Sequence, residues 1–134
     1  MENISNYNKY LSYESGRLKV ENIFLEDIAI QHGTPTFCYS INQIKDNLNN
    51  LKKSFSKIKP LICYAMKANF NKGIIKIMSK NNLGVDVVSK GELIQSLKYG
   101  IENKKIVFSG VGKTDEEINF ALKNNIKQIN VESE

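Results

Sequence analysis

Near its middle the chain reads Leu61-Ile62-Cys63-Tyr64-Ala65-Met66-Lys67, a short continuous apolar run that ends in a lysine. A run of this length without polar alternation predicts a strand that is buried on both faces. Similar runs lie on either side of it, and the strands start roughly 21 to 25 residues apart. The five expected strands lie at 36–40, 61–66, 85–88, 106–108 and 128–131.

Helical spacing of apolar residues fills the intervals between these runs. It predicts helices at 41–55, 71–80 and 91–99, the last of them closed by Gly100 as a C-cap. A fourth helix starts at Thr114, where Glu117 three residues later completes a capping box. Strands that alternate with helices predict an α/β fold with a parallel sheet and right-handed crossovers.

Two architectures satisfy this alternation. An open doubly wound sheet of about five strands is complete at this length. A (β/α)8 barrel needs about 250 residues, so this chain would hold only about half of one. Periodicity does not separate the two. Ahead of the repeat, residues 1–20 are polar and rich in tyrosine without a clear period, as in an arm that docks elsewhere, and 25–29 predicts a helical turn.

Composition excludes several classes of protein. Of the 134 residues 41% are hydrophobic and 25% are charged, and no apolar run approaches the roughly 20 residues of a membrane helix. The first residues lack the pattern of a secretory signal. Two cysteines, Cys38 and Cys63, are too few for a disulfide scaffold, so we expect reduced, buried thiols and a cytoplasmic protein.

The net charge of +5 comes almost entirely from lysine, because Arg17 is the only arginine. Nucleic-acid readers depend on the forked arginine side chain for bidentate contacts. The lysines are also spread along the chain. We therefore expect a solvated basic surface and no nucleic-acid partner.

Lys67 is the first candidate for chemistry, because it directly follows the run at 61–66. Ligand sites of parallel α/β folds lie at the carboxyl ends of the strands. Apolar walls disfavour the ammonium form of a lysine, and a neutral amine is what Schiff-base formation requires. The alternative is a lysine that only marks where a strand meets water.

Two acids follow Lys67 along the chain. Asp86 lies inside the run at 85–88, where a carboxylate is costly unless it is paired, so it could face a cationic group on the strand of Lys67. The alternative is a strand-end aspartate that points to solvent. Glu92 is a second candidate partner, or simply a favourable acid at a helix N-terminus.

Other motifs fail their tests. The segment Ser109-Gly110-Val111-Gly112-Lys113-Thr114 resembles a phosphate loop, but the leading glycine would fall on Val107, so a glycine-rich turn is preferred. His32, the only histidine, precedes a turn away from the strand ends, and we expect it to be structural or exposed. One histidine and two distant cysteines make no metal site, and no serine elbow is present.

Taken together, the motifs closely resemble the diaminopimelate decarboxylase branch of the fold-type III decarboxylases that depend on pyridoxal phosphate. The likeness runs from about residue 15 onward, and the segments occur in the order and spacing of that family. Ornithine and arginine decarboxylases share the Tyr-Ala-x-Lys and Asp-x-x-Ser pattern, whereas the segments at 109–114 and 130–133 favour the diaminopimelate branch, and alanine racemase shares a similar lysine motif but not the later segments. The segments that carry the resemblance are Tyr64–Asn69, Gly84–Leu93, Ile106–Thr114 and Ile129–Glu134.

The resemblance implies the N-terminal half of an alanine racemase-like (β/α)8 TIM barrel, incomplete here. Residues 1–35 would be an arm that in the family joins a β-domain, and 36–134 a partial barrel. Lys67 would match the lysine that binds pyridoxal 5′-phosphate through a Schiff base. Asp86 and Glu92 would match acids near that lysine, and Ala65 a small residue packed beneath the cofactor.

The resemblance also implies a carboxy-lyase of lysine biosynthesis that converts meso-diaminopimelate to L-lysine and works as a homodimer. The family's phosphate-binding glycines, the acid that pairs with the pyridine nitrogen, the stacking histidine and the substrate-binding groups lie in its second half. A chain of these 134 residues is thus expected to be inactive alone, and a second polypeptide would have to supply the missing half. The alternative is a non-catalytic remnant or module of a related ornithine or arginine decarboxylase.

Overall fold

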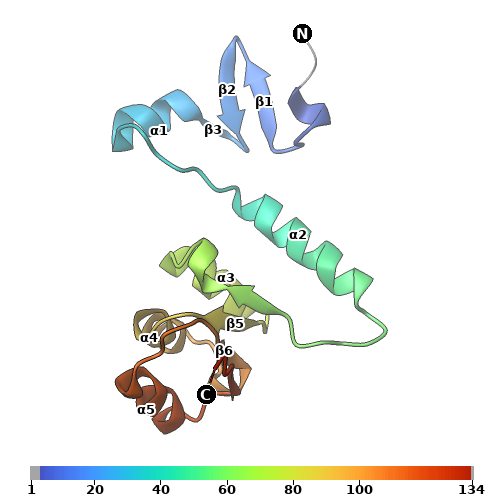
Figure 1. The fold of residues 1–134 in the computed structure, drawn as a ribbon. Coiled ribbons are helices and arrows are strands. Elements are labelled where there is room, and N and C mark those ends of the chain that lie inside the picture. Colours follow the sequence, from blue (N-terminus) through green and yellow to red (C-terminus); the bar gives the residue numbers. More distant parts are fainter. Residues whose placement is uncertain (1–3, 134) are drawn as a thin grey trace. The chain divides into compact units, whose positions relative to one another are not determined.

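The structure, a computed structural model, describes residues 4–133. The chain divides into two compact units, Met1–Lys59 and Pro60–Glu134, and each is described by itself (Figure 1). The first three residues of the expected arm, and Glu134 at the end of the last family-like segment, lie outside the described residues.

The first unit begins with the 3₁₀ turn η1 (Ile4–Asn6) and a small antiparallel sheet in the order β1-β2-β3. Its strands are β1 (Leu11–Glu14), β2 (Arg17–Val20) and β3 (Ile23–Phe24). The β1–β2 hairpin turns at Ser15 and Gly16, whose φ angles of 50° and 79° are both positive, as a tight two-residue hairpin requires. The sequence pattern did not reveal this hairpin, because its short strands are half-exposed and lack alternation.

Two helices complete the first unit. Helix α1 (Leu25–His32) confirms the expected helical turn and extends it, and α2 (Ile41–Ser54) confirms the helix expected from the spacing of apolar residues. Helix α2 begins at Ser40, whose side chain accepts a hydrogen bond from the amide of Gln43 as an N-cap.

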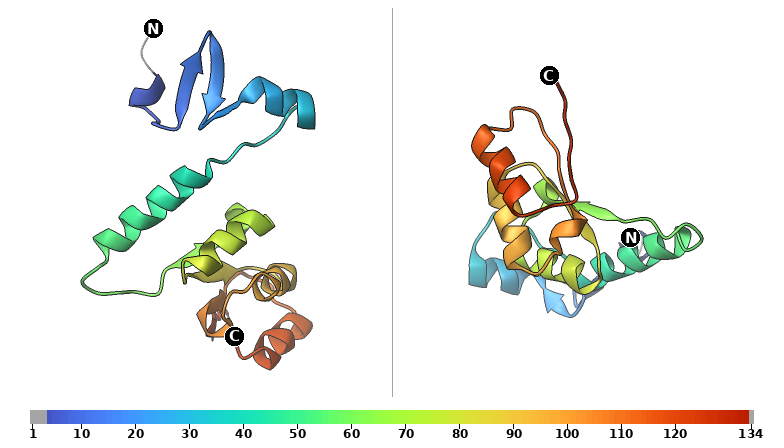
Figure 2. Two further views of the ribbon diagram at one scale, coloured as in Figure 1. Left: turned by 180° about the vertical axis from the view of Figure 1, so that it is seen from behind. Right: turned by 90° about the horizontal axis from the view of Figure 1, so that it is seen from below.

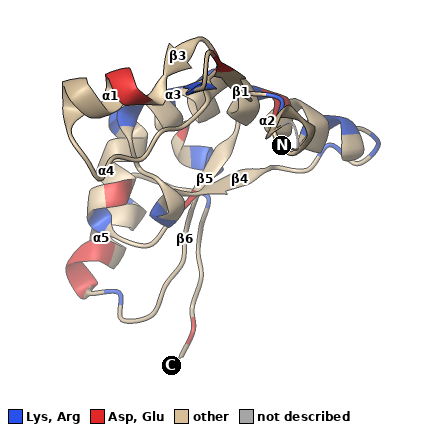
Figure 3. Cartoon of the chain, turned by 90° about the horizontal axis from the view of Figure 1, so that it is seen from above, with Lys and Arg blue, Asp and Glu red and all other residues tan. Residues whose placement is uncertain are grey.

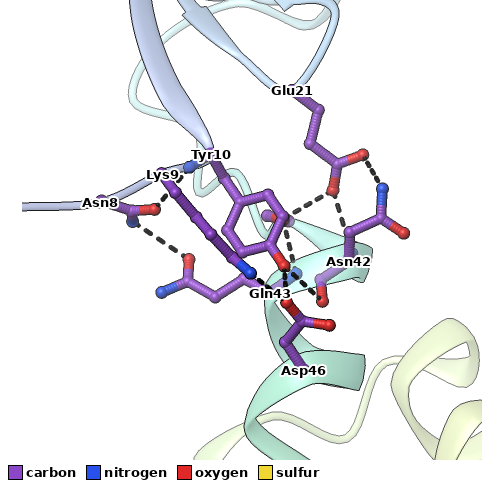
Figure 4. Close-up of polar contacts among 8 residues, drawn as sticks. Asn8, Lys9, Tyr10, Glu21, Asn42, Gln43 and Asp46 are labelled. Carbon is purple, nitrogen blue, oxygen red and sulfur yellow. Dashed lines mark hydrogen bonds and ion pairs between the residues drawn. The ribbon is translucent and has the colours of Figure 1, made fainter. Parts of the chain in front are cut away.

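Polar contacts tie the hairpin region to the start of α2 (Figure 4). Glu21 accepts hydrogen bonds from Ser40 Oγ at 2.6 Å and from the Asn42 amide at 3.0 Å. These bonds lower the pKa of Glu21, the Ser40 hydroxyl contributing most. A carboxylate thus holds the first turn of α2 from outside the helix.

Asp46, one turn further along α2, receives two donors from the arm. Lys9 Nζ forms an ion pair with it, and the Tyr10 hydroxyl donates a hydrogen bond to it (Figure 4). These partners lower the pKa of Asp46, the bond from Lys9 contributing most. All these groups lie at the surface, where such pairs are weak individually.

The strand expected at 36–40 is wrong. This segment is extended but pairs with no strand among the described residues, and Phe37 is 89% exposed. The segment does contain a run of apolar residues, but a strand also requires a neighbouring strand that accepts and donates the ladder hydrogen bonds. The run of apolar residues therefore predicted conformation correctly and pairing incorrectly.

The second unit is a regular alternation of strands and helices. Its four-stranded sheet has the order β4-β5-β6-β7, and all its strand pairs are parallel. This confirms four of the five expected strands and the three helices between and beside them. The elements are β4 (Cys63–Ala65), η2 (Met66–Ala68), α3 (Lys72–Lys80), β5 (Gly84–Val87), α4 (Lys90–Lys98), η3 (Asn103–Lys105), β6 (Ile106–Phe108), α5 (Asp115–Lys123) and β7 (Gln128–Ile129).

The strand order decides between the two architectures. Each strand lies beside its predecessor without the reversal that defines a doubly wound sheet. Helices α3, α4 and α5 lie on one side of the strand row in Figures 1 and 2. Helices on one side only, with strands added in sequence order, are the arrangement of a (β/α)8 barrel of which this unit is a part.

The two faces of the sheet differ in burial accordingly. Val85, Val87, Ile106 and Phe108 are completely buried and form the core with the helices. Their neighbours Asp86 and Val107 alternate with them and are only half-buried. Asp86 and Val107 are register partners, so they lie on the same face, the one that a closed barrel would enclose.

Helix ends follow the expected signals. Thr114 and Glu117 form the expected capping box at the start of α5. The Thr114 and Lys90 amides donate to the Glu117 carboxylate and lower its pKa, the Thr114 amide contributing most. At the end of α4 the C-cap is Tyr99, and Gly100 follows it with a φ of 88°, so the glycine expected as the cap lies one residue beyond it.

Basic and acidic side chains are both spread over the helices and loops of the two units, and Asp115, Glu116 and Glu117 lie together in the first turn of α5 (Figure 3). Within the described part of the chain, none of the helices is both long and apolar enough to span a bilayer.

Candidate functional site

Lys67 lies in η2, directly after the carboxyl end of β4. Met66 before it is completely buried, and the Tyr64 hydroxyl donates to the carbonyl of Asn69 at 3.1 Å, so the turn is held from both sides. Lys67 itself is exposed. Among the described residues no apolar walls enclose this lysine, because the turn buries Met66 and leaves Lys67 exposed.

Ala65 and Asp86 are direct register partners on β4 and β5. Ala65 is half-buried and precedes Lys67 by two residues, so a small side chain, a carboxylate and an amine share one edge of the sheet. The contacts of residues 4–133 include no hydrogen bond or ion pair between Lys67 and Asp86. The structure thus brings Ala65 and Asp86 together and places Lys67 at the same end of the strands.

Asp86 is paired, as its place in an apolar strand requires. Its Oδ1 accepts a hydrogen bond from Ser109 Oγ at 2.6 Å, and Ser109 in turn accepts one from Asn130 Nδ2 at 2.9 Å. Ser109 and Asn130 follow the last residues of β6 and β7. Sequence reasoning missed both as site residues, although the place of Ser109 just after the predicted strand at 106–108 was a signal that could have found it.

Glu92 acts at the start of α4. Ser89 is the N-cap, and its hydroxyl accepts from the Glu92 amide at 3.2 Å. The Glu92 carboxylate reaches back and accepts from the Val88 amide at 2.7 Å. This is the helix-terminal role weighed above, and it fixes the loop that follows β5 at the same edge.

Lys113 ties together the ends of β6 and β7. Its ammonium group donates to the carbonyl of Gly110 and, at 2.7 Å, to that of Asn130. The Gly110 amide donates to Glu132 at 3.0 Å. These residues line a shallow groove of about 350 Å³ between the β6–α5 loop and the segment after β7. The glycine-rich turn, preferred above to a phosphate loop, is thus closed by its own lysine.

The two cysteines are free thiols, but neither is fully buried, so the expectation that they are buried is wrong. Cys38 is exposed in the unpaired segment, and Cys63 is half-buried on β4. Burial raises the pKa of the Cys63 thiol, and the charge of Asp86 adds to the effect. His32 is exposed, as expected. Within residues 4–133 no three metal-ligating side chains gather.

The residues present fit part of pyridoxal phosphate. Lys67 supplies an accessible primary amine for its aldehyde, and Ala65 leaves room beside a carboxylate. Phosphate needs several convergent donors, and the amide of Gly110, one candidate, is already bonded to Glu132. The described residues therefore match the reactive end of the cofactor and not its phosphate.

Comparison with known proteins gives the family. Residues 41–134 match the pyridoxal-binding domain of the pyridoxal-dependent decarboxylases. A diaminopimelate decarboxylase from Aquifex aeolicus is 43% identical over 133 residues, which are 99% of this chain and 31% of that protein. One from Vibrio cholerae is 44% identical over 93% of this chain and 30% of that protein.

Solved structures agree with these relatives. The crystal structure of diaminopimelate decarboxylase from m. jannaschii in co-complex with L-lysine superposes with a TM-score of 0.86 at 35% identity, over 92% of this chain and 30% of that chain. An arginine decarboxylase of Paramecium bursaria Chlorella virus gives 0.67 at 20% identity, which shows the shared fold alone.

The chain spans about a third of the relatives that it matches, less than the half expected above. Its match to the pyridoxal-binding domain covers all of α2 and the whole second unit. The chain belongs to the pyridoxal-dependent decarboxylases, in which it corresponds to the N-terminal region of diaminopimelate decarboxylase.

Proposed function

We propose that this chain is the lysine-bearing part of a diaminopimelate decarboxylase, which forms L-lysine and carbon dioxide from meso-diaminopimelate in the cytoplasm. The observation that carries the proposal is the exposed amine of Lys67 at the carboxyl end of β4, beside Ala65 and Asp86. Pyridoxal phosphate, when bound, supplies the electron sink for loss of carbon dioxide. Binding and orientation would be the tasks of the protein's own side chains.

Each proposed site residue has a distinct task. Lys67 would hold the cofactor through its side-chain amine. Asp86 would place a carboxylate at the same end of the strands as the amine. Ala65 leaves space for a flat ring, and Glu92 keeps the β5–α4 loop in place through the Val88 amide.

The substrate is an amino acid with a carboxylate to lose. Identity to diaminopimelate decarboxylases lies between 35% and 46%, against 20% for the arginine decarboxylase, which supports the diaminopimelate branch over the alternative. We keep the homodimer, or a second polypeptide that completes the barrel, as part of the proposal. The boundary between an arm at 1–35 and a partial barrel at 36–134 belongs to the proposal too.

Borohydride trapping tests the site. The 134-residue chain is mixed with less than one equivalent of pyridoxal phosphate, reduced, digested and mapped by mass spectrometry. We expect the label on Lys67 in preference to Lys72, an equally exposed lysine five residues further along. Lys67→Arg should lose the label, and Lys72→Arg should keep it. A label spread evenly over both lysines contradicts the site.

A second experiment tests the reaction. The 134 residues alone should release no carbon dioxide from meso-diaminopimelate. Co-expression with the remaining part of the Aquifex aeolicus relative should give activity that Lys67→Arg abolishes. Activity of the chain alone would refute the expectation that a partner part is required, and activity that survives Lys67→Arg would refute the role of Lys67.

A further inference from the structure

A continuous row of hydrogen bonds runs along the carboxyl ends of β5, β6 and β7. Ser109 Oγ donates to Asp86 Oδ1 at 2.6 Å, and Asn130 Nδ2 donates to Ser109 Oγ at 2.9 Å. All three residues are half-buried. Ser109 and Asn130 come from different strand ends, so only the folded sheet brings them to Asp86.

The direction of the Ser109 hydroxyl follows from its neighbours. A serine hydroxyl has one proton to donate. Gln128 Nε2 donates to Asn130 Oδ1 at 2.5 Å, which leaves the Asn130 amide nitrogen to face Ser109. Because that nitrogen only donates, the proton of Ser109 goes to Asp86. If the Asn130 amide were reversed, its oxygen would take the proton of Ser109. Ser109 Oγ and an ionised Asp86 Oδ1 would then lie 2.6 Å apart with no proton between them.

The backbone beneath this row is well supported. The Ser109 amide donates to the Val87 carbonyl and the Asn130 amide to the Phe108 carbonyl, both at 2.8 Å, so the parallel ladder continues past the ends of the strands. Lys113 adds its bond to the Asn130 carbonyl at 2.7 Å. The side chains of Ser109 and Asn130 thus stand on backbone that is fixed on both sides.

We infer that Ser109 is a positioning residue for Asp86, and that Asn130 sets the direction of its hydroxyl. The inference rests on the proposed function, in which Asp86 acts beside Lys67. A carboxylate with one oxygen held no longer rotates freely, so its negative charge stays at the edge that Asp86 shares with Ala65. That edge lies at the same end of the strands as Lys67, which follows β4 directly in η2.

The hydrogen-bonded row is tested first without cofactor. The side-chain amide resonance of Asn130 is recorded by NMR with and without Asp86→Asn, in Ser109→Thr and Ser109→Ala backgrounds. We expect Asp86→Asn to shift this resonance when position 109 carries a hydroxyl and to leave it in place when it carries alanine. Equal shifts in both backgrounds, or no shift in either, would overturn the inference.

The role of the row is tested by borohydride trapping at Lys67 across a pH series. Ser109→Ala removes the bond that holds Asp86 Oδ1, so we expect it to change the extent or the pH profile of labelling at Lys67. Asn130→Asp should have a similar effect, because a carboxylate at position 130 takes the proton that Ser109 gives to Asp86. Ser109→Thr should keep the wild-type extent and pH profile.

Ser79→Ala is the matched control, because it removes a serine hydrogen bond to the Gly100 carbonyl in the same unit but away from this edge. Circular dichroism checks that each variant is folded. If the wild-type chain labels Lys67 and Ser109→Ala labels it with the same extent and pH profile, the positioning role is wrong. If the wild-type chain does not label Lys67, the proposed function fails, and the NMR comparison alone decides the inference.

Discussion

The two units of this chain are stabilised by different forces. In the second unit the apolar sides of a parallel sheet and three helices bury one another, and Val85, Val87 and Phe108 are completely inaccessible. In the first unit Leu48 is the one apolar side chain among the described residues that is buried. Surface hydrogen bonds and ion pairs, among them those on Glu21, Asp46 and Arg17, contribute to its tertiary contacts.

The two kinds of contact differ in how much they stabilise the fold and in how strongly they respond to pH and salt. Burial of apolar surface is large in energy and nearly independent of pH and salt. Exposed polar contacts are small in energy and respond to both. The stability of the unit that carries Lys67 is therefore expected to change little with pH and salt, whereas the contacts of the first unit should respond to both.

The largest expected effect comes from a matched pair of phenylalanines. Phe108→Ala empties a completely buried site and should lower the free energy of unfolding by about 3–5 kcal/mol. Phe37→Ala, at a side chain 89% exposed, should change it by less than about 0.5 kcal/mol. Urea denaturation measures both. A similar loss for the two variants would break the contrast between the units.

A matched pair of glycines gives the next largest effect. A Cβ on Gly84 would lie 2.3 Å from the Lys105 carbonyl oxygen and 2.8 Å from Cys63 Sγ. Gly84→Ala should therefore cost about 1–3 kcal/mol as β5 shifts away from its neighbours. Gly91→Ala in α4 meets only Ser89 Oγ at 3.8 Å, so it should stabilise by about 0.5–1 kcal/mol. Thermal unfolding of both variants checks the opposite signs.

The capping box of α5 predicts a smaller loss in the second unit. Thr114→Ala removes the oxygen that accepts from the Glu117 amide and should cost about 1 kcal/mol. Thr114→Ser retains that oxygen and should be nearly neutral. Chemical denaturation of the pair measures the difference, and an equal loss in both would assign the effect to packing of the threonine methyl group.

The smallest effect is a local acid transition in the first unit. The pKa of Glu21 is lowered in the folded chain, so its contacts are present at neutral pH and are lost as the pH falls through that lowered value. The backbone amide resonance of Asn42, which donates to Glu21, should follow this transition with a midpoint below the ordinary glutamate value of 4.5.

Glu21→Gln controls for other acids, because it should abolish the transition at Asn42. High salt should weaken the neighbouring contact between Lys9 and Asp46. A transition at Asn42 that persists in Glu21→Gln would show that another group controls the start of α2.

Most elements of the second unit could be predicted because the information that specifies them is local. Continuous apolar runs mark the strands, and the spacing of Ile74, Ile75 and Met78 marks the buried side of α3. Capping signals at Ser89 and Thr114 lie within four residues of the helices that they start. The hairpin at 11–20 was not predicted because its half-exposed strands lack alternation, and the segment at 36–40 was wrongly predicted to be a strand because pairing depends on distant residues.

The candidate site also has a part that the local sequence predicts and a part that only the folded sheet creates. Lys67 and Asp86 could be chosen from their places at the end of and within apolar runs, where side-chain chemistry is readable residue by residue. The contacts of Ser109 and Asn130 with Asp86 could not be predicted, because these hydrogen bonds depend on which strands are adjacent and in what register. The exposure of Lys67 likewise came from the turn after β4, which buries Met66 in its place. Local patterns identify the elements and the reactive types, whereas contacts between distant strand ends exist only once the sheet has formed.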